Sequence, residues 1–111
     1  MLKVIVVDDE RFVRMGIVGE TDWASLGCEV VGEAENGWDA LELVHKKNPD
    51  LMICDIRMPK MNGLEMLKKL REEKNPVQVI FLTAYSEFSY AREALKLYAF
   101  DYLLKPFEDG E

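Results

Sequence analysis

Five polar side chains capable of chemistry stand where short apolar runs of this sequence end. They are three carboxylates, one hydroxyl and one ammonium, carried by Asp8, Asp9, Asp55, Thr83 and Lys105. Three carboxylates close together repel one another unless a positive charge lies among them. A hard divalent ion such as Mg²⁺, or Mn²⁺ in its place, takes oxygen ligands and is commonly held by one or two carboxylates and a phosphate.

Phosphoryl transfer is the chemistry that these groups could support together. The Thr83 hydroxyl and the Lys105 ammonium could hold the equatorial oxygens of a phosphoryl group, whose transfer depends mainly on positioning and charge neutralisation. Asp55 would be the nucleophile, so the product on the protein would be an aspartyl-phosphate. The sequence therefore predicts a site for a divalent cation and a phosphoryl group, centred on Asp55.

These side chains can act together only if the fold brings the ends of the apolar runs to one edge. Each run is short and apolar, as expected for strands of a parallel sheet, and helical periodicity follows each of the first four. The predicted strands cover residues 4–7, 28–32, 51–54, 77–82 and 102–104. This alternation is typical of a doubly wound α/β domain with a five-stranded parallel sheet and right-handed crossovers. In such domains, sites form outside the carboxyl ends of the strands.

Local signals mark the helices of this pattern. The first predicted helix has Phe12 and Met15 on one face, and Glu10 is assigned to its positive N-terminal end rather than to the metal. The segment Asn62 to Glu65 is a variant of the capping box that starts a helix. Ser86 could cap a fourth helix.

The end of the sequence carries a separate expectation. Phe107 to Glu111 is too short for a fifth helix after the last strand. We therefore expect one domain over residues 1–111 whose fifth helix is missing or truncated. One face of the sheet would then lack cover, which would lower the stability or favour a homodimer.

Composition and charge argue against several classes of function. The 111 residues are 49% hydrophobic, enough for a core without disulfides or a structural metal. Acidic residues outnumber basic ones by 21 to 14, and the net charge of -7 argues against direct binding to nucleic acid or to an anionic membrane surface. Cys28 and Cys54 have neither a disulfide framework nor a zinc spacing, and no apolar run approaches the ~20 residues of a membrane helix. We expect a cytoplasmic domain.

In this order and at these intervals, the motifs resemble the receiver domain of response regulators in two-component signalling. The resemblance extends from Lys3 to Phe107. The motifs that carry it are Asp8-Asp9, Asp55 followed by Met58-Pro59 and Gly63, Thr83-Ala84, and Tyr102 to Pro106. The resemblance implies a flavodoxin-like fold whose parallel strands take the order 2-1-3-4-5.

The resemblance also implies a role for each residue of the site. Asp55 would accept a phosphoryl group from the phosphohistidine of a sensor histidine kinase. Asp9 and Asp55 would bind Mg²⁺ directly, and Asp8 would act through a water molecule. The main-chain carbonyl of Arg57 would complete the protein ligands.

A readout of the phosphorylated state is implied as well. Thr83 and Lys105 would contact the phosphoryl oxygens, and Thr83 would move toward the phosphate while Tyr102 turns inward. The surface reshaped by these movements would comprise the fourth helix, within residues 88–98, and the last strand, residues 101–104.

Two segments outside the site point to an output in the parent protein. Trp23 and the segment Ser86 to Ala91 resemble receivers attached to AraC-type DNA-binding modules, so the switch would control transcription through a separate module. The domain would catalyse its own phosphorylation and dephosphorylation without being a multiple-turnover enzyme.

Other hypotheses for the same residues stay open. An aspartyl phosphatase would need a second aspartate two residues after the nucleophile as general acid, and Arg57 stands there. An interaction module that keeps the fold without the switch would have no need of the complete set of acidic, threonine and lysine residues. A nucleotide-binding site would need a glycine-rich loop, which the sequence lacks.

Overall fold

The structure is a computed structural model of the chain. It describes the main chain of residues 1–84 and 101–105, and the side chains of residues 1–82. The strands are β1 (Leu2–Val7), β2 (Cys28–Ala34), β3 (Leu51–Asp55), β4 (Gln78–Ala84) and β5 (Asp101–Lys105). The helices are α1 (Arg11–Glu20), α2 (Gly37–Lys47) and α3 (Gly63–Glu72), with a short 3-10 turn at Ala24–Leu26.

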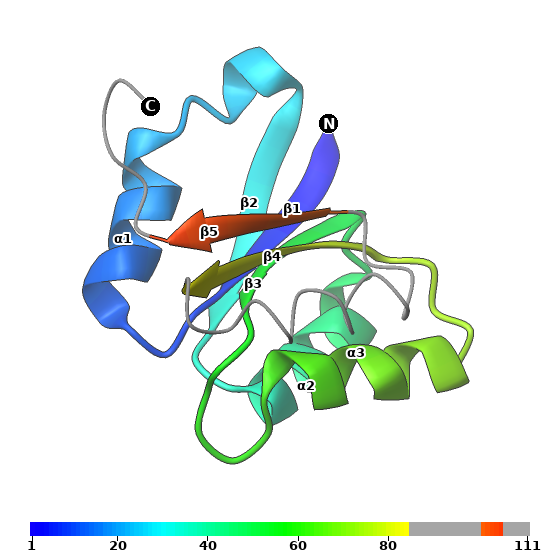
Figure 1. The fold of residues 1–111 in the computed structure, drawn as a ribbon. Helices are drawn as coiled ribbons and strands as arrows, with labels where there is room; N and C mark the ends of the chain where they lie inside the picture. The colour runs from blue at the N-terminus through cyan, green and yellow to red at the C-terminus, as the bar shows by residue number, and fades with distance from the viewer. Residues whose placement is uncertain (85–100, 106–111) are drawn as a thin grey trace.

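The strands form one parallel sheet, which confirms the predicted doubly wound, flavodoxin-like α/β fold. The order is β2-β1-β3-β4-β5, as the resemblance implied, and every neighbouring pair is parallel. In Figure 1, α1 lies on one face of this sheet, and α2 and α3 lie together on the other. All strands therefore point their carboxyl ends toward one edge.

The interior strand β1 is buried on both faces because helices cover it on both sides. Val4, Ile5, Val6 and Val7 are each at most 1% exposed. Side chains alternate along a strand, so Ile5 and Val7 join the core under α2 and α3 while Val4 and Val6 face the other side. The continuous apolar run in the sequence is explained by this double burial.

Asparagine caps begin the two helices that cover the larger core. The Asn36 side chain accepts a hydrogen bond from the Asp39 amide at 2.9 Å. The predicted capping box at Asn62 is confirmed: the Asn62 Oδ1 atom accepts from the Glu65 amide at 2.8 Å, and Glu65 Oε1 accepts from the Asn62 amide at 3.2 Å. These caps fix where each helix starts.

Helix α1 departs from the expectation for its apolar face. Phe12 is 85% exposed and Met15 is 51% exposed, and none of the residues of α1 is fully buried. The helix begins at Arg11, with Glu10 at the N-cap position, and the Glu10 side chain makes no capping hydrogen bond. Its role at the helix end, as predicted from sequence, is therefore not one of capping.

Two predictions concern residues outside the described ones. The predicted fourth helix, from Ser86 to Tyr98, falls in residues 85–100, and the predicted lack of a fifth helix concerns residues 106–111. Within the described part of the chain, none of the helices is long and apolar enough to span a bilayer.

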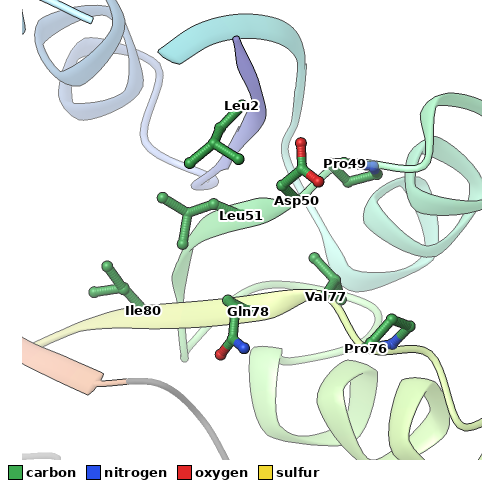
Figure 2. A pocket seen from close by; sticks show the side chains of 8 residues that line it. All are labelled: Leu2, Pro49, Asp50, Leu51, Pro76, Val77, Gln78 and Ile80. Carbon is green, nitrogen blue, oxygen red and sulfur yellow. The ribbon is translucent and has the colours of Figure 1, made fainter. Parts of the chain in front are cut away.

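An apolar pocket lies at the amino-terminal edge of the sheet, the end opposite to the predicted site. Figure 2 shows Leu2, Leu51 and Ile80 lying close together on β1, β3 and β4. Lys3 and Asp50 join these strand starts through two main-chain amides: the Lys3 amide donates to the Asp50 carboxylate at 2.7 Å, and the Asp50 amide to the Lys3 carbonyl at 2.8 Å. Among the described residues that line this pocket, Asp50 is the one acidic residue, so the pocket is not a second site for a divalent cation and a phosphoryl group.

Two glycines in helices give a matched test of packing at the reactive edge. A Cβ atom on Gly63 would overlap the Asp55 carbonyl oxygen and lie 2.8 Å from the Phe81 ring, whereas one on Gly16 would have no heavy atom within 4 Å. We expect Gly63→Ala to lower the free energy of unfolding by about 1–3 kcal/mol through overpacking. Gly16→Ala should raise it by up to about 1 kcal/mol, because alanine loses less backbone entropy in a helix. Urea denaturation checks both, and equal effects of the two substitutions would contradict the close packing at Gly63.

Candidate functional site

Strand register brings two buried aspartates side by side at the carboxyl edge of the sheet. Val7 of β1 is in register with Cys54 of β3, so the residues that follow, Asp8 and Asp55, are neighbours. Asp8 is 0% exposed and Asp55 is 6% exposed. Their proximity therefore follows from the pairing of two central strands.

Four carboxylates gather at this edge. Asp8, Asp9, Glu10 and Asp55 each offer an oxygen atom, and these atoms all lie within 4.8 Å of one another. Asp9 and Glu10 are exposed while the other two are buried, so the cluster is open to solvent on one side. An oxygen-only donor set with room for water suits a hard divalent cation such as Mg²⁺. Among the described residues this cluster could hold a metal ion, as the sequence predicted for three of its members.

Hydrogen bonds hold the loop that carries the first three carboxylates. The Asp8 amide extends the β1–β2 pairing by donating to the Ala34 carbonyl at 3.1 Å. Asp8 Oδ1 accepts from the Glu10 amide at 2.9 Å, and the Asp8 carbonyl accepts from Arg14 Nη1 at 2.6 Å. Asp8 is thus fixed through its amide, its carbonyl and its side chain.

The loop after β3 is held just as closely. Asp55 Oδ1 accepts from the Ile56 amide at 2.8 Å, which fixes the carboxylate. The Gly63 amide donates to the Ile56 carbonyl at 2.7 Å, and the Gly37 amide donates to the Met61 carbonyl at 2.9 Å. The starts of α2 and α3 therefore hold both ends of this loop. Arg57, whose carbonyl was predicted to bind the cation, lies in the loop with its side chain exposed.

The remaining predicted residues are placed by the main chain. Leu82 is in register with Asp55, so Thr83 stands one position beyond it on β4. Lys105 is in register with Ala84, one strand further, and so ends at the same edge. Tyr102 is in register with Phe81, in the interior of the last strand.

Two residues near the cluster were missed by sequence reasoning. Glu10 was assigned to the helix end, yet its carboxylate joins the acidic cluster. Arg14 was given no role, yet its guanidinium contacts both the Asp8 carbonyl and the Glu33 carboxylate. The adjacency of Glu10 to Asp8-Asp9 was a usable signal, whereas nothing in the sequence separates Arg14 from Arg11, a basic residue of the same helix.

Comparison with known proteins gives one consistent family. The response regulator receiver domain family matches residues 4–111. The uncharacterized transcriptional regulatory protein YesN of Bacillus subtilis is 43% identical over 106 residues, which cover 96% of this chain and 29% of YesN. The chain therefore spans less than a third of the length of that relative.

Solved structures agree with this result. The receiver domain of AraT, a response regulator from Geobacillus stearothermophilus, has a TM-score of 0.89 at 45% identity, over 96% of this chain and 83% of that chain. The CheX-CheY-BeF3-Mg²⁺ complex from Borrelia burgdorferi contains a chain with a TM-score of 0.82 at 27% identity, over 96% of this chain and 80% of that one.

The family match covers nearly the whole chain, and both the sheet order and the acidic edge have the form that the resemblance implied. This chain belongs to the response regulator receiver domain family.

Proposed function

We propose that residues 1–111 form a phosphorylation-dependent switch in which Asp55 accepts a phosphoryl group from a sensor histidine kinase. The observation that carries the proposal is the gathering of Asp8, Asp9 and Asp55 at one sheet edge, where the strands bearing Thr83 and Lys105 also end. Such a set of groups supports phosphoryl transfer by positioning and charge neutralisation.

A divalent cation, Mg²⁺ or Mn²⁺, would be held by the oxygen atoms of this edge. Asp9 and Asp55 would bind it directly, Asp8 through a water molecule, and Arg57 through its carbonyl. When bound, the cation neutralises charge that builds up on the phosphoryl oxygens. The oxygen-only donor set supports this assignment. The BeF3 and Mg²⁺ of the related CheY complex do so as well, since beryllofluoride imitates a phosphoryl group.

The protein's own residues would position the reacting atoms. The Ile56 amide orients the Asp55 carboxylate by its bond to Oδ1, so that a carboxylate oxygen can attack phosphorus as the bond to the donor nitrogen breaks. The Thr83 hydroxyl and the Lys105 ammonium would take up the transferred oxygens. Movement of Thr83 and Tyr102 would then pass the phosphorylated state to the face formed by residues 88–98 and 101–104.

The partners follow from the relatives and from the charge of the domain. The parent protein would carry an output module that binds DNA, since YesN, of which this chain matches 29%, is a transcriptional regulatory protein. With its net charge of -7, the domain would bind neither nucleic acid nor membrane itself, and it would act in the cytoplasm. Its apolar surface could support a homodimer.

Substitution of Asp55 tests the phosphoacceptor directly. With Mg²⁺ and acetyl phosphate, the intact mass of the wild type should rise by one phosphoryl group, and Asp55→Asn should show no increase, because the amide is not a nucleophile. Asp22→Asn, which changes an exposed aspartate outside the cluster, should react as the wild type does. Modification of Asp55→Asn, or of the wild type after chelation of Mg²⁺, would contradict the proposal. Multiple turnover of an unrelated phosphomonoester would favour a phosphatase instead.

Substitution of Asp9 tests the cation site. We expect Asp9→Asn to weaken Mg²⁺ binding about tenfold, a loss of about 1.4 kcal/mol, and to raise the melting temperature in EDTA, because one of the clustered carboxylates loses its charge. The wild type should gain about 2.7 kcal/mol of stability at a Mg²⁺ concentration of a hundred times Kd. Thermal denaturation with and without Mg²⁺ measures both effects.

The control for this experiment is Glu42→Gln, which neutralises an exposed carboxylate on α2. Its response to Mg²⁺ should match that of the wild type. An Asp9→Asn protein that responds to Mg²⁺ as the wild type does would rule out Asp9 as a ligand.

Substitution of Lys105 separates phosphorylation from its readout. Lys105→Ala should still be phosphorylated, but the amide chemical shifts of residues 85–105 should change little on addition of beryllofluoride and Mg²⁺, because the ammonium no longer links the phosphoryl group to the last strand. Lys68→Ala removes an exposed lysine of α3 and should shift as the wild type does. Wild-type shift changes in Lys105→Ala would exclude this role for Lys105.

A further inference from the structure

Arg14 makes two polar contacts that join the acidic loop to the neighbouring strand. Its Nη1 atom donates to the Asp8 carbonyl at 2.6 Å, and its Nε atom donates to Glu33 Oε1 on β2 at 3.0 Å. The Arg14 side chain is only 16% exposed, against 44% for Glu33. A guanidinium that is largely withdrawn from water holds its partners in a more defined geometry than an exposed ion pair does.

The Asp8 carbonyl is a sensitive point of the loop. It belongs to the planar peptide group that joins Asp8 to Asp9, so a bond to this oxygen fixes the orientation of that plane. The Asp8 amide donates to the Ala34 carbonyl, and the Asp8 side chain accepts from the Glu10 amide. The bond from Arg14 adds a restraint on the peptide plane between Asp8 and Asp9, which limits rotation of their carboxylates away from Asp55.

Two opposite effects on cation binding follow from this arrangement. The positive charge of Arg14 repels a cation, while the fixed peptide plane presents the carboxylates ready to bind it. Glu33 compensates the charge of Arg14 through their ion pair, so the repulsion is largely cancelled over the distance to the cluster. The ordering effect remains, because the contact with Asp8 is direct.

We infer that Arg14 is a positioning residue for the cation site and sets its affinity for Mg²⁺ through the Asp8 carbonyl. The inference rests on the proposed function of the acidic cluster. An arginine suits the task because its planar group donates from Nε and from Nη1 in two directions, which a lysine ammonium on a flexible chain reproduces poorly.

The test compares Mg²⁺ affinity with stability in Arg14→Ala. By isothermal titration calorimetry, we expect Kd for Mg²⁺ to rise about tenfold, as is typical when a residue that orients metal ligands through hydrogen bonds is removed. Phosphorylation by acetyl phosphate should need correspondingly more Mg²⁺, while its rate at saturating Mg²⁺ stays near that of the wild type. A lower melting temperature in EDTA with an unchanged Kd would reduce Arg14 to a structural role and overturn the inference. Tighter Mg²⁺ binding would overturn it too, because charge repulsion would then dominate.

Matched variants keep the test decisive. Arg11→Ala removes an exposed arginine of the same helix and should leave Kd unchanged, which controls for net charge. Arg14→Lys keeps the charge, supports folding if Arg14→Ala fails to fold, and should give an intermediate Kd. If both Arg14→Lys and Arg14→Ala bound Mg²⁺ with the wild-type Kd, the inference would be overturned.

Glu33→Gln keeps an acceptor for Nε and leaves the bond to Asp8 intact, but it removes the charge that compensates Arg14. Its Kd should therefore rise, though by no more than about twofold, because charges of partly exposed ion pairs are screened by solvent. A loss of Mg²⁺ affinity as large as that of Arg14→Ala would place the effect in the ion pair and overturn the role of the bond to the Asp8 carbonyl.

A wild-type protein that binds no Mg²⁺ and takes up no phosphoryl group would refute the proposed function itself. If the wild type binds Mg²⁺ and takes up a phosphoryl group, but Arg14→Ala binds Mg²⁺ with the wild-type Kd, only the role of Arg14 is refuted.

Discussion

Electrostatic repulsion among the carboxylates at one sheet edge is the constraint on which the rest of this structure depends. Asp8 and Asp55 are buried there with Asp9 and Glu10 beside them, and one carboxylate oxygen of each residue lies within 4.8 Å of those of the others. Like charges at such distances favour separation, so the backbone must hold them against it. The fold does this with two interior strands, β1 and β3, and with hydrogen bonds to the Asp8 and Asp55 carboxylates at their ends.

The two loops at this edge are held from different parts of the molecule. The loop after β1 is tied to β2 and α1, through Ala34 and Arg14. The loop after β3 is tied to the starts of α2 and α3, through Gly37 and Gly63. The site is thereby connected to helices on both faces of the sheet.

Much of this arrangement could be predicted from sequence because parallel strands share a carboxyl edge. An aspartate directly after an apolar run must lie at that edge, whatever the details of packing, and this places Asp8 and Asp55. The helix cap at Asn62 could be predicted as well, because it depends only on residues close to it in the sequence. The exposure of Phe12 and Met15 on α1 could not be predicted, because periodicity shows which residues share a face but not what covers that face.

The contributions of Glu10 and Arg14 were hidden for a related reason. Both depend on the direction that a long side chain takes, which is decided by tertiary neighbours such as Glu33 and not by spacing along the chain. For Thr83, Tyr102 and Lys105, the register places the residues on their strands, and the roles assigned to them stay predictions.

The register between β1 and β3 has a consequence for the folding of the chain. Side chains alternate between the faces of a strand, so a slip of one residue would send Asp8 and Asp55 to opposite faces and disperse the carboxylates. Cation affinity would then report whether β1 and β3 are paired in this register. In a preparation of this protein, molecules whose central strands have paired wrongly could be counted as the fraction that fails to bind the ion.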